Sequence, residues 1–509
     1  MSEISKRQRV LDLTVFACGA VVMTFEIIGS RVLSPFIGAS TYVWTSLIGV
    51  ILGSLSLGYW LGGRLADRKP DLKILASVIF IAGGLISVTV LIKEIALLAI
   101  ASAPVGVELR SVIASIILFA PASVCLGFVT PYTVKLRMLS LADAGKTVGR
   151  LYALSTVGSI VGTFAAGFVL IPFVGSIRTL YALSAVLIAL SLLLVPFAIT
   201  RMGIGVIVIF VFSIISNEAG ASLLLRTNGL HDIDTEYSRI QVFKTIEPNS
   251  GKPIQALATD PYFAQSAMFL DSDEPAFEYG RYYHLARHFK PNFRDTLAIG
   301  GAGYSVPKDF LRRYPDMKID VVEIDKQMTA IARKYFRLQD DPRLSIIHED
   351  GRTFLRRSDS AKYDVILMDA FGSLFSVPYQ LTTVEAVLEM RRTLRDDGVV
   401  IFNLGSSISG EASRFLQAEL ATYRSVFPTV QLYKVNLEYE DTYLQNLMIV
   451  ASASPITRET TSPDPELESL LSHRYTDDLP ATAQIITDDL APVEYYNSIA
   501  QNIYLAKRK

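Results

Sequence analysis

The sequence predicts a bundle of about seven membrane-spanning α-helices, followed by a small β unit and a doubly wound α/β domain. Three observations support this prediction. The chain has 509 residues, which is too long for one ordinary hydrophobic core. Apolar residues and glycine dominate residues 11–216, whereas residues 226–509 have the mixed charge of a water-soluble protein. In this second part, short apolar runs alternate with helical stretches, as in a parallel sheet covered by helices.

The N-terminal region, residues 1–217, is the predicted transmembrane domain. Its apolar stretches approach the roughly 20 residues that an α-helix needs to cross a bilayer. We predict seven spans, at residues 11–33, 41–63, 73–92, 109–130, 149–171, 178–199 and 202–217. The last stretch is short and residues 93–104 are also apolar, so six or eight spans stay open as alternatives.

Basic residues indicate the orientation of the predicted bundle. They cluster at the N-terminus and after the second and fourth spans, at Lys6, Arg7, Arg9, Arg64, Arg68, Lys69, Lys73, Lys135, Arg137, Lys146 and Arg150. The positive-inside rule places these segments in the cytoplasm. Seven spans would then leave the C-terminal region outside, whereas six would return it to the cytoplasm.

Pairs of small residues spaced four apart occur at Gly49/Gly53, Gly58/Gly62 and Gly158/Gly162. Such pairs let neighbouring helices approach closely. We interpret them as contacts within the bundle, and the seam of a homodimer is the alternative.

Two further domains are expected after the bundle. Residues 218–280 should form a small antiparallel β unit with a connecting segment, because alternating runs occur at Ser222–Arg226, Arg239–Ile246 and Gln255–Thr259. Residues 281–509 should form the α/β domain, with strands near 296–300, 318–323, 344–347, 363–368, 398–403, 430–435 and 446–451. Helices are expected between these strands, at 305–314, 326–337 and 383–395.

Composition excludes several classes of function. The net charge of −1 and the pI near 6.6 provide no basic surface for nucleic acid. Both cysteines, Cys18 and Cys125, fall within apolar spans, and no Cys/His group has the spacing of zinc ligands. We therefore expect neither a disulfide nor a bound metal.

Glycines and acidic residues follow successive predicted strands and should meet at one edge of the sheet. Gly300, Gly301 and Gly303 lie between a strand and a helix, so the backbone there can approach a ligand; a tight turn is the simpler interpretation. Glu323 closes the next strand, 20 residues after Gly303, where a carboxylate can accept both ribose hydroxyl protons. This edge is predicted to bind a nucleoside.

The order and spacing of these pieces, with Asp350-Gly351 and Asp369 after the next two strands, resemble the spermidine synthase (polyamine aminopropyltransferase) family. This family is a variant of the S-adenosylmethionine methyltransferase fold. The resemblance covers about residues 225–450, and the apolar N-terminal half is similar to the membrane-fused branch of the family.

The resemblance implies further donor-binding residues. Asp350, followed by Gly351, matches the acid that accepts a hydrogen bond from the adenine amino group; a turn-forming Asp-Gly pair is the alternative. Asp325, Gln265 and His284 are also assigned to the donor site, and for His284 a purely structural role is the alternative.

The resemblance also implies residues for the amine. Asp369 matches the catalytic aspartate, which would hold the attacking amine and take its proton; a helix N-cap is the alternative. Tyr237 lies in a segment, residues 234–240, that is similar to the entry motif of the family, with Ser238 where the family has glutamine. Tyr283 is a further expected substrate contact.

Two departures from the family pattern concern the reaction. Gly303 stands where the family has an aspartate that would repel the carboxylate of intact S-adenosylmethionine. Gly372 stands where the family has a second aspartate that grips a distal ammonium. The acidic side chains of Asp488, Asp489 and Glu494 could supply that missing charge; an ordinary acidic loop is the alternative.

The resemblance implies a membrane-integrated transferase that moves an aminopropyl group from decarboxylated S-adenosylmethionine to an amine or polyamine, without a metal. One alternative is methyl or aminocarboxypropyl transfer from intact S-adenosylmethionine, motivated by Gly303. Another is a transporter that senses a polyamine or nucleoside without turnover, because residues 62–68 resemble a loop of major facilitator transporters.

The expected location is the inner (cell) membrane of a bacterium-like cell, with the lipid bilayer around the N-terminal helices. We expect the catalytic domain on the cytoplasmic side, where donors of the adenosylmethionine type are made. This expectation requires that one of the seven spans is miscounted.

Overall fold

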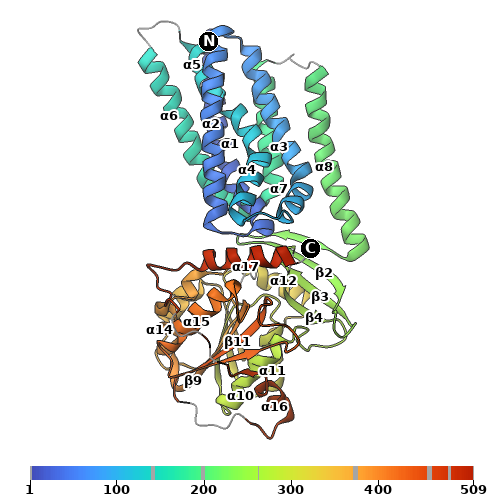
Figure 1. Cartoon of the computed structure of the whole chain (residues 1–509). Coiled ribbons are helices and arrows are strands. Elements are labelled where there is room, and N and C mark those ends of the chain that lie inside the picture. Colours follow the sequence, from blue (N-terminus) through green and yellow to red (C-terminus); the bar gives the residue numbers. More distant parts are fainter. Residues whose placement is uncertain are drawn as a thin grey trace. The chain divides into compact units, whose positions relative to one another are not determined.

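The computed structural model describes residues 3–138, 144–195, 201–261, 263–370, 377–455, 461–477, 479 and 483–507. The chain forms two compact units, Met1–Arg226 and Thr227–Lys509, each with its own hydrophobic core (Figure 1). The boundary between them lies within the predicted connecting segment, residues 218–280.

The first unit is built from helices. They are α1 (Glu3–Ile37), α2 (Thr41–Arg68), α3 (Leu72–Ala101), α4 (Val107–Gly127), α5 (Val129–Arg137), α6 (Ala144–Ala165), the π-helical turn η1 (Ala166–Val174), α7 (Ser176–Leu194) and α8 (Arg201–Asn228). In the described part of the chain, six helical segments are long and apolar enough to cross a membrane: Arg7–Ile37, Thr41–Arg68, Leu72–Ala101, Val107–Arg137, Ala144–Val174 and Ser176–Leu194.

Each of the first six predicted spans overlaps one of these segments. The predicted seventh span, 202–217, lies in α8, whose apolar stretch Ile204–Gly220 is shorter than the others. The apolar residues after Lys93 continue α3 and form no separate span. Length and composition of the described helices therefore support the six-span alternative.

Small residues bring α1 and α6 into close contact. A Cβ atom added at Gly158 of α6 would overlap the carbonyl oxygen of Phe16 in α1. One turn further along, the hydroxyl of Thr24 donates a hydrogen bond of 3.1 Å to the carbonyl oxygen of Gly162. Such close approach is what small-residue pairs permit in helices that cross a membrane.

The other two glycine pairs differ in their surroundings. On α2, a Cβ atom at Gly58 would overlap the carbonyl oxygen of Val124 in α4, and one at Gly62 would meet the backbone of Phe128, the residue that follows α4. Gly49 and Gly53 have no atom within 4 Å of an added Cβ. Two of the three pairs thus lie at contacts within the bundle, and a homodimer through the third stays a prediction.

Replacing Gly158 by alanine should destabilise the bundle by about 1–3 kcal/mol, because the added methyl group forces α1 and α6 apart. Gly49→Ala is the matched control, since the same change there meets no atom within 4 Å. Thermal unfolding of the full-length protein in detergent should show a lower Tm for Gly158→Ala alone. Equal Tm values for both variants would contradict the close packing of α1 on α6.

The second unit begins with a small antiparallel sheet. Its strands pair in chain order: β1 (His231–Asp234), β2 (Arg239–Ile246), β3 (Pro253–Ala258) and β4 (Ala264–Phe269). The predicted runs 239–246 and 255–259 are confirmed as β2 and β3. The predicted run Ser222–Arg226 is wrong, because this leucine-rich segment continues helix α8, as its high helix propensity favours.

The rest of the second unit contains an eight-stranded sheet in the order β12-β10-β11-β9-β8-β5-β6-β7. The strands are β5 (Asp295–Ile299), β6 (Lys318–Val322), β7 (Leu344–Ile347), β8 (Tyr363–Met368), β9 (Leu394–Ser406), β10 (Thr429–Lys434), β11 (Gln445–Ser452) and β12 (Arg474–Tyr475). β5 to β9 pair in parallel, and β10 to β12 are antiparallel to their neighbours. Every strand predicted for this domain overlaps one of these strands.

Helices connect the strands. They are α9 (Tyr279–Tyr282), η2 (Tyr283–Leu285), α10 (Ala286–Phe289), α11 (Ser305–Arg313), α12 (Lys326–Tyr335), α13 (Gly351–Arg357), η3 (Tyr379–Leu381), α14 (Val384–Thr393), η4 (Glu411–Ser413), α15 (Arg414–Arg424), α16 (Pro465–Leu471) and α17 (Val493–Lys507).

Alternate residues of β8 belong to two different cores: Ile366 and Met368 pack on one side, Val365 and Leu367 on the other. The sheet is therefore covered on both faces, as a doubly wound fold requires.

The chain order reverses beside β5. β6 and β7 follow it on one side, while β8 and β9 lie on the other. Loops that leave the strands in opposite directions open a crevice at such a switch point. The predicted glycine loop after β5 and the acids after β6, β7 and β8 all lie along this carboxyl edge.

Candidate active site

Gly300 and Asp369 meet at the switch point of the large sheet. The N–H of Asp369 donates a hydrogen bond of 3.0 Å to the carbonyl oxygen of Ile299, at the end of β5. Gly300 has φ +99°, and a Cβ atom there would overlap the carbonyl oxygen of Asp369. Only glycine fits at this position, and the fit holds the glycine loop beside the acid after β8.

Glu323 binds the glycine loop through its carboxylate. Its Oε2 accepts hydrogen bonds from the N–H groups of Gly301 and Ala302 at 3.0 and 3.2 Å, and its Oε1 accepts from Asp325 N–H at 2.9 Å. Burial raises the pKa of Glu323, and these three donors oppose the shift. A carboxylate has about four acceptor positions, so one remains for a ribose hydroxyl in this arrangement.

The glycine loop has a constrained backbone. Ala302 and Tyr304 both have positive φ, at 43° and 55°, which is uncommon for residues other than glycine. The buried hydroxyl of Tyr304 is fixed by a hydrogen bond of 2.7 Å to Thr329. Backbone strain of this kind persists where the surroundings enforce it, and it is concentrated at binding sites.

Gly303 packs against the small sheet. A Cβ atom at Gly303 would lie 2.5 Å from the hydroxyl oxygen of Ser266 and 3.0 Å from the ring of Phe336. The Ser266 hydroxyl is itself 3.2 Å from that of Ser305. An aspartate, which the related family has at this place, therefore would not fit here unless Ser266 moved.

A cavity of about 350 Å³ opens beside Asp369. Its apolar walls are formed by Phe263, Phe277, Val377, Leu404 and Phe415. Its polar lining comes from Gln265, Tyr279, Asp369, Asn403 and Asn446. A smaller cavity of about 30 Å³ along the glycine loop shares Gln265, Tyr279 and Asp369 with the first. Asp369 thus lines both the smaller cavity along the glycine loop and the larger cavity.

The surroundings of Asp369 suit a base near neutral pH. Burial raises the pKa of its carboxyl to about 6, although hydrogen bonds from the Asn403 amide and the Tyr279 hydroxyl oppose the shift. These bonds measure 3.1 Å from Asn403 Nδ2 to Oδ1 and 3.3 Å from Tyr279 to Oδ2. A raised carboxyl pKa is typical of groups that accept a proton during catalysis. Residues 371–376 lie outside the described part of the chain, so the N-cap alternative for Asp369 stays untested.

Asn403 is a site residue that the sequence analysis missed. It lies in β9, within the apolar run 399–404, and its side chain is 7% exposed. Among the described residues, its Oδ1 has no hydrogen-bond partner. A single amide inside an otherwise apolar strand was the available signal, because a buried polar group without a structural partner calls for a ligand.

Gln265 and Tyr283 lie at the site, where the resemblance places them. The Gln265 amide is fixed by Thr259 N–H, which donates to its Oε1 at 2.6 Å, and by the carboxylate of Asp260, 3.2 Å from its Nε2. The buried hydroxyl of Tyr283 donates to the carbonyl oxygen of Met368 at 3.0 Å. In the structure Tyr283 thus supports the strand before Asp369, and its contact with substrate stays a prediction.

Asp325 and Asp350 each begin a helix. Asp325 accepts a hydrogen bond from the N–H of Gln327 at 2.9 Å, and its other oxygen accepts from the hydroxyl of Thr235 at 2.5 Å. Asp350 accepts from the N–H of Thr353 at 2.9 Å. Both residues cap helices, and binding of the donor by their remaining acceptor positions stays a prediction.

Gly351 and Tyr237 lie near these caps. A Cβ atom at Gly351 would be 2.7 Å from Cγ2 of Ile299, so the first turn of α13 packs directly on β5. The side chain of Tyr237 is 46% exposed. Partial burial and then the negative charges of Glu236, Asp325 and Asp350 raise the pKa of Tyr237.

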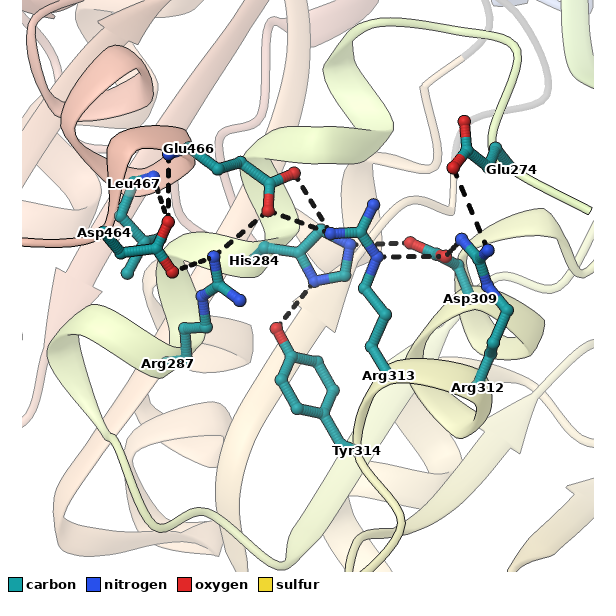
Figure 2. Close-up of polar contacts among 10 residues, drawn as sticks. All are labelled: Glu274, His284, Arg287, Asp309, Arg312, Arg313, Tyr314, Asp464, Glu466 and Leu467. Carbon is teal, nitrogen blue, oxygen red and sulfur yellow. Dashed lines mark hydrogen bonds and ion pairs between the residues drawn. The ribbon is translucent and has the colours of Figure 1, made fainter.

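His284 lies in a buried polar network away from the two cavities (Figure 2). Its Nε2 is 2.6 Å from Oδ2 of Asp309, and its Nδ1 is 2.8 Å from the hydroxyl of Tyr314. These partners assign the neutral tautomer that donates from Nε2 and accepts at Nδ1. Arg313 joins Asp309 to Glu466 of α16. The structure favours the structural role for His284.

Acidification should destabilise the protein through His284. Burial lowers the pKa of this imidazole, and the negative charge of Asp309 opposes the shift only in part. In the unfolded chain, His284 has a pKa of about 6.5 and binds a proton below this pH, whereas in the folded chain it stays neutral until a lower pH. The free energy of unfolding is therefore unaffected by His284 above this pH, and it falls on acidification by at most about 1.4 kcal/mol per pH unit.

Denaturant unfolding of the full-length protein between pH 7.5 and 5.5 measures this effect. His284→Gln keeps hydrogen-bonding capacity but cannot titrate, so its stability should depend less on pH than that of the unaltered protein. An equal pH dependence in both proteins would contradict the assignment.

The predicted acids near the C-terminus do not line either cavity. Asp488 accepts hydrogen bonds from the hydroxyl of Thr383 at 2.6 Å and from Arg352 at 3.1 Å. Asp489 is exposed, and Glu494 is half-buried at the start of α17. Their role in amine binding stays a prediction. Gly372 lies outside the described residues.

Comparison with known proteins identifies the second unit. Residues 280–462 match the family model of the spermine/spermidine synthase domain. A polyamine aminopropyltransferase from Agathobacter rectalis is 31% identical over 209 residues, which are 40% of this chain and 68% of the relative. A polyamine aminopropyltransferase from Vibrio vulnificus is 35% identical over 152 residues, 30% of this chain and about half (49%) of that relative's length.

Among solved structures, a probable spermidine synthase from Corynebacterium glutamicum aligns with a TM-score of 0.43 and 20% identity. The alignment covers 51% of this chain and 96% of that one. Together with the family model and the bacterial relatives, the site geometry leads to one conclusion: the chain belongs to the spermine/spermidine synthase family of polyamine aminopropyltransferases, with a block of apolar helices before the family domain.

Proposed function

We propose that the chain is an aminopropyltransferase that moves an aminopropyl group from decarboxylated S-adenosylmethionine to an amine. The position of Asp369 carries this proposal. Its carboxylate lies between the glycine loop and the 350 Å³ cavity, with a pKa raised to about 6. A group at this place can contact both a donor on the loop and an amine in the cavity.

In the proposed reaction, the amine nitrogen attacks the carbon beside the sulfonium of the donor. The new C–N bond forms as the C–S bond breaks, and the electron pair of that bond stays on sulfur. Methylthioadenosine leaves as a neutral thioether. Asp369 takes the proton that the amine must lose, and the cavity walls hold nitrogen and carbon in line.

The donor would lie along the edge formed by the loops after β5, β6 and β7. Gly300 and Gly301 allow the nucleoside to approach the backbone, Glu323 would accept from the ribose, and Asp350 would select adenine. The position of these residues along one edge supports the assignment. The free acceptor position of Glu323 can take one ribose hydroxyl, and accepting the second would require Glu323 to exchange one of its bonds to the loop N–H groups.

A second candidate reaction is methyl or aminocarboxypropyl transfer from intact S-adenosylmethionine. The packing of Gly303 on Ser266 favours it, because no carboxylate stands there to repel the amino acid end of the intact donor. Both reactions use the same edge and the same base, so donor preference distinguishes them.

We also infer that the N-terminal unit is inserted in the cell membrane, with the catalytic unit in the cytoplasm. The six apolar segments support insertion by their length and composition. An even number of crossings returns the chain to the side of its basic N-terminus, where the donor is made. The variant Asp359→Cys tests this placement, because it puts a thiol at an exposed position of the second unit. In intact cells, a membrane-impermeant thiol reagent should not label this cysteine.

Mass spectrometry of the purified full-length protein tests the reaction. The protein in detergent is incubated with each donor and a panel of amines. Methylthioadenosine together with an aminopropylated amine from the decarboxylated donor supports the proposal. Methylated or aminocarboxypropylated amine from the intact donor supports the second candidate. Tight binding of donor or amine without any product would contradict both, and it would favour the sensing alternative.

A further inference from the structure

The cavity beside Asp369 provides negative charge at one end only. Among the described residues that line it, Asp369 is the single acid. The other walls consist of the rings of Phe263, Phe277 and Phe415 and of neutral amides such as that of Asn446. The cavity thus combines one carboxylate with a largely apolar body.

No acid other than Asp369 lines the cavity among the described residues, and the acids considered nearby have other partners. Residues 371–376 contain no Asp or Glu in the sequence. Asp260 lies behind Gln265 and does not line the cavity, and its carboxylate accepts hydrogen bonds from Phe263 N–H at 3.0 Å and from Gln265 Nε2 at 3.2 Å. Asp488 is paired with Arg352.

Asn403 marks where the nitrogen of the acceptor should lie. Its amide nitrogen donates to Asp369, and its carbonyl oxygen is buried without a hydrogen-bond partner among the described residues. A buried acceptor of this kind is costly unless a donor reaches it. An amine between Asp369 and Asn403 would supply that donor and would be correctly placed for loss of its proton.

The register of β9 and β11 shows what the far end of the acceptor would meet. Gly405 follows Asn403 by two residues on the same face of β9, roughly 7 Å further along, and pairs with Asn446 of β11. The second ammonium of a short diamine would reach this region. It would lose its water there without a carboxylate to replace it, and phenyl faces offset only part of that cost.

We propose that the acceptor of this chain is a primary monoamine with an apolar body, and not a diamine or polyamine. The nitrogen is held between Asp369 and Asn403, and the carbon chain or ring fills the space among Phe263, Phe277 and Phe415. This inference rests on the proposed transfer reaction, because it assigns the acceptor of that reaction.

Two probes of equal length test the inference. Pentylamine and 1,4-diaminobutane differ in having a methyl group or an ammonium at the far end. With the preferred donor, the full-length protein should use pentylamine with a kcat/KM at least tenfold higher. 2-Phenylethylamine should also be a substrate, because its ring fits the aromatic walls.

Asn446→Asp adds the missing charge at the far end of the cavity and provides a gain of function. It should raise kcat/KM for 1,4-diaminobutane at least tenfold and lower that for pentylamine, whose methyl end would desolvate the new carboxylate. Asn249→Asp, in the exposed turn between β2 and β3, is the matched control with the same change of charge. It should alter neither value.

The outcomes separate this inference from the proposed function. Preference for 1,4-diaminobutane in the unaltered protein overturns the inference and leaves the transferase assignment intact. The inference is also overturned if Asn446→Asp has an unchanged Tm and does not raise kcat/KM for 1,4-diaminobutane. If no amine is consumed with either donor, the transferase assignment fails and the inference fails with it.

Discussion

Asp369→Asn should lower kcat by about 10²- to 10⁴-fold while the protein stays folded, because asparagine keeps the size of the side chain but cannot take a proton. In the unaltered protein, activity should fall as the pH drops through about 6, the raised pKa of the Asp369 carboxyl. The remaining activity of Asp369→Asn should lack this acidic limb. Initial rates of thioether release between pH 5 and 9 measure both effects.

The same substitution should increase stability. The folded chain holds a proton on Asp369 up to about pH 6, whereas the unfolded chain loses it near 3.8. Stability therefore decreases as the pH rises through this window, and at neutral pH the full cost of the ionised group is present. Asparagine removes this cost, so we expect a gain on the order of 1–2 kcal/mol, reduced by the partial exposure of Asp369.

Asp359→Asn is the matched control, because Asp359 is exposed after α13 and lies in neither cavity. It should change neither turnover nor Tm. Unaltered turnover in Asp369→Asn would remove Asp369 from the reaction, whatever its effect on stability.

Glu323→Gln should weaken donor binding by about 10- to 100-fold, because charge-assisted hydrogen bonds are lost. The carboxylate accepts three backbone N–H groups at 2.9–3.2 Å, two of them from the glycine loop. A glutamine presents its own NH₂ group to some of these donors, so at least one N–H loses its partner. The loop should then leave its binding conformation.

Calorimetric titration with methylthioadenosine measures the affinity, and it needs no acceptor. Glu438→Gln, at an exposed position after β10, is the matched control and should bind as the unaltered protein does. Because Glu323 also fixes the loop, the Tm of Glu323→Gln must be recorded alongside. Unchanged affinity in a folded Glu323→Gln variant would contradict a nucleoside site at this edge.

The edge residues could be predicted from the sequence because parallel strands carry a strong local signal. Gly300, Glu323, Asp350 and Asp369 each follow a short apolar run, and the order of such runs determines which residues share an edge. The small sheet was harder to predict. The residues of β1 are largely polar, and β4 begins with small and polar residues before Met268 and Phe269, so neither shows the alternation of a half-buried strand.

The partners of individual side chains could not be predicted, because they depend on contacts between distant segments. Asn403 reaches Asp369 from 34 residues away, and His284 finds Asp309 across 25 residues. The sequence around a histidine does not show whether its imidazole binds a ligand or a carboxylate of the same chain. The count of spans had a related difficulty, since the apolar part of α8 is close to the length that a bilayer requires.

The hydroxyl of Thr235 adds a polar link between the small antiparallel sheet and the carboxyl edge of the large sheet. Thr235, just after β1, binds Asp325, and the backbone of Asp325 in turn binds Glu323. A displacement of β1 would be transmitted through this contact to Asp325 and from there to Glu323. With ribose bound at Glu323 as proposed above, a partner that moves the β1–β2 hairpin would change the affinity for the nucleoside.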